Sequence, residues 1–247
     1  MAYKNILFDL DGTLTDPYPG MAGSLRYALG KFGIVEDSAE RIRQFIGPPL
    51  YQSFIEFYGF DENRAKMAVD YYREYYADKG LYDNKLYDNV DNLLKTLKDA
   101  GKACIIATSK PQKFALEVLR YLNIERYFDE VVGSNFEGTL YEKEDIIKFA
   151  IENGGLDRAE TVMVGDRKYD ILGARKNGID SIAVAYGYGT VEELEGAGPT
   201  HICKNVMDIL ESTLPIIKSK SNNNMEGTKS MNMEGTPPLR GEPYPTL

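Results

Sequence analysis

The sequence predicts an α/β protein with a Rossmann-like, doubly wound parallel sheet and a small all-helical cap domain inserted into it. From about residue 82 onward, short apolar runs alternate with segments of helical spacing, the pattern of a parallel sheet with helices on both faces. Between about residues 15 and 81 the strand patterns disappear and only helical spacing remains. The length of 247 residues is enough for one α/β domain and a smaller inserted one.

The first strand and the helical block that follows it occupy the first third of the chain. Asn5-Ile6-Leu7-Phe8 is a short apolar run that opens into a glycine turn. Helical spacing then occurs near residues 21–32, 38–45, 50–58 and 61–79. Most aromatic side chains of this block recur at helical spacing, so we expect them to form the core of a small bundle.

Strands and helices alternate through the rest of the chain. A helix over residues 90–100 is indicated by an N-cap at Asp88 or Asn89 and by Gly101, which ends it. Strands are predicted at 103–107, 131–132, 161–164 and 181–185, and helices at 113–122, 145–153 and 169–177. In such sheets ligands bind beyond the carboxyl ends of the strands.

These patterns divide the chain into three parts. Residues 1–15 and 82–217 are predicted to form the α/β core, and residues 16–81 the helical cap. From about Lys218, Ser, Asn, Gly and Pro dominate, and Asn-Met-Glu-Gly-Thr occurs twice. Because this low-complexity segment offers too little apolar surface to offset its ordering entropy, we expect residues 218–247 to be a disordered tail.

Composition excludes several classes of partner. The net charge of −9 repels polyanions, which argues against nucleic acid. No apolar run approaches the roughly 20 residues of a membrane span, and the start lacks signal-peptide anatomy, so we expect no membrane association. Cys104 lies inside an apolar run and is predicted to be a buried thiol, which fits a cytoplasmic protein.

Missing motifs narrow the chemistry further. A cysteine phosphatase needs an arginine six residues after its cysteine, but Lys110 and Ile209 occupy those positions after Cys104 and Cys203. His201 is the only histidine, and a histidine mechanism would need partners that the chain lacks. No Walker loop is present. Carboxylates, lysines and a metal ion remain as candidates for difficult chemistry.

Three sets of polar residues follow predicted strands. Asp9 and Asp11 are two residues apart at the end of the first strand, and Gly12 allows a sharp turn close to a ligand. Two neighbouring carboxylates favour a hard cation or the protonation of one of them. Two further sets follow later strands: Thr108 with Ser109 at an expected helix start, and Asp166 with Asp170 four residues later.

Lys143 lies between the second and third of these sets in the sequence. Along the chain, the candidate residues are therefore an acidic pair, a hydroxyl, a lysine and a second acidic pair. Lys143 lies in Glu142-Lys143-Glu144, which taken alone is typical of a solvated surface, in the predicted loop after residues 131–133. With this combination, the sequence over roughly residues 3–217 resembles the haloacid dehalogenase superfamily of phosphatases. The resemblance is to members with a helical cap inserted after the first motif, such as phosphoglycolate phosphatases.

The resemblance implies a magnesium-dependent hydrolysis of a small phosphorylated metabolite through an aspartyl-phosphate. By it, Asp9 is the nucleophile, Asp11 is the general acid/base, and Lys143 neutralises the phosphorylated Asp9. It also implies that Thr108 and the Ser109 backbone hold the phosphoryl group. Mg²⁺ would be bound by Asp9, the Asp11 carbonyl and Asp166, with Asp170 supporting the metal or Lys143 from behind.

Alternatives stay open at this point. Asp11 favours ester cleavage over dehalogenation, because a halide leaves without a proton. A phosphosugar mutase shares the first chemical step, and a catalytically silent phosphate-binding module is disfavoured by the intact Asp9, Asp11, Lys143 and Asp166. Phosphoglycolate and a nucleoside monophosphate, as for a 5′-nucleotidase, are both candidate substrates. We expect a monomer or weak homodimer.

The cap is expected to close over the core and to determine specificity. Residues 15–17 and the region of Gly80 join the helical block to the strands, so they are the expected hinges. The loop Gly47-Pro48-Pro49-Leu50 and the helix after it are predicted to face the site. On that helix, Tyr51 and Phe54 are the expected specificity residues.

Overall fold

A six-stranded, all-parallel sheet forms the centre of the computed structural model, which describes residues 3–136 and 139–214. Its strands are ordered β5-β4-β1-β6-β7-β8, so the first strand of the chain lies inside the sheet. The bounds are β1 (Asn5–Phe8), β4 (Ala103–Pro111), β5 (Glu130–Ser134), β6 (Thr161–Gly165), β7 (Asp180–Val184) and β8 (His201–Cys203). The predicted parallel α/β fold is confirmed.

Strand β1 pairs with β4 on one side and with β6 on the other. Phe8, its last residue, is in register with Ile106 of β4 and Val164 of β6. Because parallel strands end at the same edge, the residues that follow these three strands meet there. This register places the polar segments after β1, β4 and β6 side by side.

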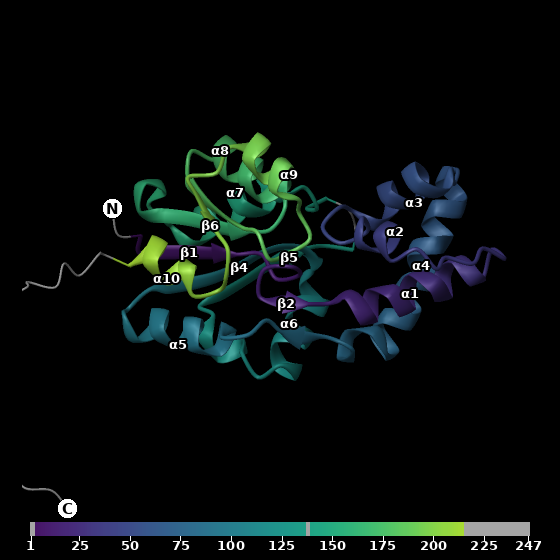
Figure 1. Ribbon diagram of the computed structural model, residues 1–247, viewed down its shortest axis with the longest axis horizontal. Helices are drawn as coiled ribbons and strands as arrows, with labels where there is room; N and C mark the ends of the chain where they lie inside the picture. The colour runs from purple at the N-terminus through teal and green to yellow at the C-terminus, as the bar shows by residue number, and fades with distance from the viewer. Residues whose placement is uncertain (1–2, 137–138, 215–247) are drawn as a thin grey trace, which may run out of the picture. The chain divides into compact units, whose positions relative to one another are not determined.

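Each face of the sheet has its own apolar layer, since successive side chains of a strand point to opposite faces. Ile6 and Phe8 pack in one layer, whereas Leu7 packs in the other with Met163 and Ile147. Figure 1 shows helices α5, α6 and α10 along one face and α7, α8 and α9 along the other. Their bounds are α5 (Val90–Asp99), α6 (Gln112–Tyr121), α7 (Lys143–Gly154), α8 (Lys168–Lys176), α9 (Val191–Ala197) and α10 (Asp208–Thr213).

Between β1 and β4 the chain forms a helical segment, which we define as residues 18–82. It contains α1 (Tyr18–Gly30), α2 (Ala39–Arg43), α3 (Leu50–Tyr58), α4 (Glu62–Asp78) and the 3₁₀ turn η1 (Gly80–Tyr82). Helix α1 packs on α4, and Gly20 approaches Gly80 so closely that a Cβ on Gly20 would lie 1.9 Å from the Gly80 carbonyl oxygen. The helices thus agree with the predicted helical block, while its status as a separate cap domain stays a prediction.

Several short elements are absent from the sequence prediction. A two-stranded antiparallel ribbon of β2 (Thr15–Asp16) and β3 (Lys85–Leu86) joins the helical segment to the sheet, where hinges were predicted. Strand β8, helices α9 and α10, and the turns η2 (Glu125–Tyr127) and η3 (Arg158–Glu160) are likewise additions. The predicted tail at 218–247 lies outside the described residues. Over residues 3–136 and 139–214, no helix has the length and apolar character needed to cross a membrane.

Candidate active site

Asp9 follows β1 directly, and the sheet fixes its backbone. Its N–H donates to the Val164 carbonyl at 2.9 Å, which continues the β1–β6 register by one residue. The carboxylate is buried, and its Oδ1 accepts a hydrogen bond from the Leu10 N–H at 2.8 Å. The predicted nucleophile is therefore held at the carboxyl edge of the sheet in one orientation.

Asp166 and Asp170 bring two more carboxylates to Asp9. Asp166 follows β6, Asp170 lies in the first turn of α8, and one oxygen of each of the three residues lies within 4.8 Å of the others. Asp166 Oδ2 accepts from the Tyr188 N–H at 2.7 Å. We call Asp9, Asp166 and Asp170 the acidic cluster.

Gly12 shows how closely the chain is packed around the acidic cluster. A Cβ at Gly12 would lie 2.2 Å from Asp166 Oδ2, and the residue has a φ of +86°, which side chains rarely adopt. Only glycine therefore lets the turn after Asp11 pass Asp166 at this distance. The close approach that the structure shows for Gly12 is to a cluster carboxylate, and its predicted approach to a ligand stays a prediction.

Lys143 supplies the positive charge that faces the acidic cluster. Its Nζ lies 3.0 Å from Asp9 Oδ1, 2.8 Å from Asp170 Oδ1 and 3.1 Å from the Ala107 carbonyl oxygen. Only 5% of its side chain is exposed, so the solvated surface position that its acidic neighbours would predict is wrong. It is also the first residue of α7 and not part of a loop.

The electrostatics of this site favour a bound cation. Burial, together with the charges of Asp170 and Asp9, raises the pKa of Asp166 well above its ordinary value. Burial also raises the pKa of Asp170, although Lys143 opposes the shift. Three buried carboxylates face one ammonium, and their all-oxygen donor set is the kind that hard divalent cations prefer. The residues present therefore fit a Mg²⁺ ion.

Asp11 lies beside the cluster and has a partner of its own. Its Oδ2 lies 2.6 Å from Lys110 Nζ, and its Oδ1 accepts from the Thr15 hydroxyl at 3.4 Å. Lys110 is almost fully buried and also lies over the ring of Tyr76 in α4, 4.8 Å from its centroid. Sequence reasoning missed Lys110, although a lysine next to Thr108 and Ser109 at a strand end was a usable signal.

Thr108 and Ser109 lie in the last part of β4. They were expected at a helix start, but β4 continues to Pro111 and α6 begins at Gln112. The pairing with β5 shifts register between Thr108 and Pro111, so the regular ladder is interrupted at the strand end. The buried Thr108 hydroxyl accepts from the Lys110 N–H at 3.3 Å, and the Ser109 carbonyl accepts from the Ser134 hydroxyl at 2.8 Å.

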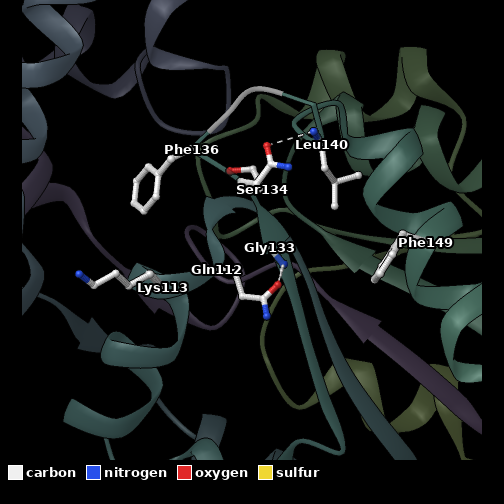
Figure 2. Close-up of a pocket in the computed structure, with 8 residues that line it drawn as sticks. Gln112, Lys113, Gly133, Ser134, Phe136, Leu140 and Phe149 are labelled. Carbon is white, nitrogen blue, oxygen red and sulfur yellow. Dashed lines mark hydrogen bonds between the residues drawn. The ribbon is translucent and has the colours of Figure 1, made fainter.

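A separate cavity of about 420 Å³ lies at the outer edge of β5 (Figure 2). Its lining includes Gln112, Gly133, Ser134 and Phe136 and contains none of the predicted site residues. Two of its polar groups are engaged within the core: Gln112 accepts from the Gly133 N–H, and the Ser134 hydroxyl donates to the Ser109 carbonyl. We therefore place the candidate site at the acidic cluster and not in this cavity.

Comparisons with known proteins agree with this fold. Residues 6–184 match the family model described as haloacid dehalogenase-like hydrolase. The chain is 44% identical over 215 residues to a 5′-nucleotidase of Pseudomonas aeruginosa, covering 86% of this chain and 97% of that protein. It is 30% identical over 216 residues to a phosphoglycolate phosphatase of Vibrio parahaemolyticus, covering 84% and 95%.

Solved structures give the same result. The crystal structure of a predicted phosphatase from Clostridium acetobutylicum superimposes with a TM-score of 0.83 at 44% identity, covering 86% of this chain and 98% of that one. The fold and these relatives define a phosphoric monoester hydrolase, as the sequence predicts. The chain belongs to the haloacid dehalogenase-like hydrolase family.

Proposed function

We propose that the protein is a magnesium-dependent phosphatase that forms an aspartyl-phosphate on Asp9. The observation that carries this proposal is the contact of 3.0 Å between Asp9 Oδ1 and the buried ammonium of Lys143. The Leu10 N–H contacts the same oxygen at 2.8 Å. Lys143 and the Leu10 N–H therefore orient the carboxylate so that Oδ2 is the oxygen available to attack phosphorus.

In the first step, Asp9 Oδ2 forms a bond to phosphorus while the bond to the ester oxygen breaks. Asp11 gives its proton to that leaving oxygen, and Lys143 compensates the charge on the phosphorylated Asp9. Thr108 and the Ser109 N–H hold the phosphoryl oxygens. Mg²⁺, bound by Asp9, Asp166 and the Asp11 carbonyl, would neutralise charge on the phosphate.

In the second step, Asp11 takes a proton from water, whose oxygen attacks phosphorus and releases Asp9. Asp11 therefore serves first as acid and then as base, and the proton that it takes from water replaces the one that it gave to the leaving oxygen. Asp170, 2.8 Å from Lys143, is a positioning residue that holds the ammonium toward Asp9. These roles of Asp9, Asp11, Thr108, Ser109, Lys143, Asp166 and Asp170 are those that the resemblance implies.

We further propose that the substrate is a 5′-nucleoside monophosphate. The support is comparative: the 5′-nucleotidase relative is 44% identical, whereas the phosphoglycolate phosphatase relative is 30% identical. The family resemblance pointed first to phosphoglycolate, with a nucleoside monophosphate as the alternative, so this proposal reverses that order. We also propose a cytoplasmic monomer or weak homodimer, a setting compatible with the two free cysteines.

Phosphate release from a panel of esters tests the proposal. Purified protein with Mg²⁺ should hydrolyse 5′-nucleoside monophosphates faster than phosphoglycolate or hexose phosphates. Asp9→Asn should reduce turnover by at least about 10³-fold while the circular dichroism spectrum is unchanged. Residual activity above about a tenth of wild type would remove Asp9 as the nucleophile. Transfer of phosphate to a second sugar hydroxyl would instead indicate a mutase.

A further inference from the structure

Arg167, the residue after Asp166, joins the helical segment to the α/β core. Its Nε and Nη2 donate to the two carboxylate oxygens of Glu193 at 2.9 and 3.3 Å, a two-pronged ion pair. Its Nη1 donates to the carbonyl oxygen of Ile46, which lies just beyond the end of α2. Only 12% of the Arg167 side chain is exposed. One guanidinium thus contacts a carboxylate of the core and a carbonyl of the helical segment.

The turn at Gly47 is shaped to accept this side chain. Gly47 has a φ of +108°, in the region that favours glycine. A Cβ on Gly47 would lie 3.0 Å from both Cγ and Nη1 of Arg167. The guanidinium therefore occupies the space that any larger residue at Gly47 would need. The turn and the arginine fit each other independently of the hydrogen bond to Ile46.

The other end of Arg167 connects to the acidic cluster. Its backbone N–H donates to Asp170 Oδ2 at 3.1 Å, and Asp170 contacts Lys143. A displacement of the Ile46–Gly47 turn is therefore opposed by a residue whose backbone is fixed between two cluster carboxylates. The two-pronged pair with Glu193 in α9 fixes the plane of the guanidinium so that Nη1 points to the Ile46 carbonyl. Glu193 also accepts from the Lys168 N–H at 2.9 Å.

We infer that Arg167 is a positioning residue that holds the Ile46–Gly47 turn of the helical segment over the phosphoryl site. The turn would then form part of the substrate enclosure, and its effect on catalysis rests on the proposed function. The contact itself is independent of that function. Lysine would replace arginine only in part, because a single ammonium lacks the planar fork that contacts Glu193 and Ile46 together.

Hydrogen exchange of the wild-type chain and two variants tests the contact directly. Arg167→Met should increase amide exchange in peptides covering residues 42–50 by about 10-fold, the factor expected from losing one charge-assisted hydrogen bond. The matched control is Arg175→Met, which removes an arginine of α8, the helix that follows Arg167; Arg175 donates to the carbonyls of Ala197 and Gly198 within the core. That variant should leave exchange at residues 42–50 unchanged. Equal exchange in wild type and Arg167→Met would overturn the inference.

Kinetics separate positioning from a purely structural role. With a 5′-nucleotide, Arg167→Met should raise KM by about 10-fold, because the enclosure is loosened. KM for p-nitrophenyl phosphate should change less, and Arg167→Lys should recover only part of the loss. A parallel loss with both esters would contradict the positioning role.

Two further outcomes remain informative. Should Arg167→Met fail to fold, Glu193→Gln provides the same exchange test, because it weakens the fork while keeping the side-chain shape. If the wild type hydrolyses no ester at all, the proposed function fails. The exchange experiment then still decides whether Arg167 holds the turn.

Discussion

The ammonium of Lys143 lies 3.0 Å from the carboxylate of Asp9, and both groups are shielded from water. Burial alone would lower the pKa of a lysine, but the carboxylates of Asp170 and Asp9 raise the pKa of Lys143 above its ordinary value. The lysine is thus held fully charged beside the proposed nucleophile. It can compensate negative charge that develops on Asp9 without any rearrangement.

Lys143→Met should therefore lower kcat by at least about 10²-fold, as expected when a fixed charge at the reacting group is lost. It should also destabilise the metal-free protein by about 3–5 kcal/mol, since it leaves buried carboxylates unpaired. Urea unfolding and phosphate release measure the two effects. Lys148→Met, an exposed position on the same helix, is the control and should change stability by less than about 0.5 kcal/mol. Near-normal turnover of Lys143→Met would contradict the role of the lysine.

Magnesium should stabilise the folded protein as well as support turnover. At about 100 times its dissociation constant a ligand stabilises by about 2.7 kcal/mol, which corresponds to a rise in Tm of about 5–10 °C. Asp166→Asn should lose most of this rise. Calcium should support little turnover, because its looser geometry does not keep an Asp9 oxygen aligned for attack. Full activity in excess chelator would remove the metal from the mechanism.

The sequence was sufficient to predict the long helices and strands and the edge of the sheet where the site lies. Strands β1, β4, β6 and β7 are recognisable as apolar runs. Helix α3 has the predicted bounds because its helical spacing and its flanking residues, Pro49 and Gly59, indicate the same two ends. The β2–β3 ribbon was not predictable in this way. Its strands have two residues each, too short for any periodicity, and they pair residues that lie on either side of the whole helical segment in the sequence.

The site was predictable in its motifs but not in its pairings. Lys143 resembles a surface lysine in sequence because its immediate neighbours are acidic, and only the fold brings Asp9 and Asp170 to it. The ion pair of Lys110 with Asp11 links residues 99 positions apart. The Tyr188 N–H that holds Asp166 is a backbone group, so no side-chain motif identifies it. Long-range contacts of this kind leave no local pattern.

Neither cysteine should react in the native protein at pH 8. Burial raises the pKa of the Cys104 thiol to about 12, and burial also raises the pKa of Cys203. The thiolate fraction of Cys104 should therefore be about 10³-fold below that of an ordinary cysteine. Titration with a chromogenic disulfide should detect both thiols only after denaturation. Rapid labelling of the native chain would mean that these thiols are accessible.

The same shift has a consequence for stability at high pH. Because the folded-state pKa of Cys104 is raised, the folded protein binds more protons than the unfolded chain between the ordinary value of 9.0 and about 12. The contribution of the neutral thiol is complete below that window and is lost as pH rises through it. Cys104→Ala should therefore show a shallower fall in unfolding free energy between pH 9 and 12 than the wild type.

Specificity should depend on Arg43 and not on Phe54. Phe54 was predicted to face the substrate, but it is fully buried among the rings of Phe45, Tyr58 and Phe60, with centroid distances of 5.3, 6.4 and 5.9 Å. Truncation of such a phenylalanine leaves a cavity and costs about 3–5 kcal/mol. Phe54→Ala should lower Tm strongly and reduce turnover of a 5′-nucleotide and of p-nitrophenyl phosphate in parallel.

Arg43 lies at a different kind of position. It is exposed at the end of α2, and its guanidinium lies 5.0 Å from the ring centroid of Tyr18 and 5.9 Å from that of Tyr188. The backbone N–H of Tyr188 donates to Asp166, so Tyr188 contacts both the arginine and the acidic cluster. Arg43→Ala should change stability by less than about 1 kcal/mol, the value of an exposed cation–π contact. It should lower kcat/KM for the nucleotide about 10-fold more than for p-nitrophenyl phosphate, because the small ester lacks the groups that the guanidinium would contact. If instead Phe54→Ala separates the two esters and Arg43→Ala does not, the aromatic cluster must open to the substrate during turnover, and the bundle core would then be part of the specificity site.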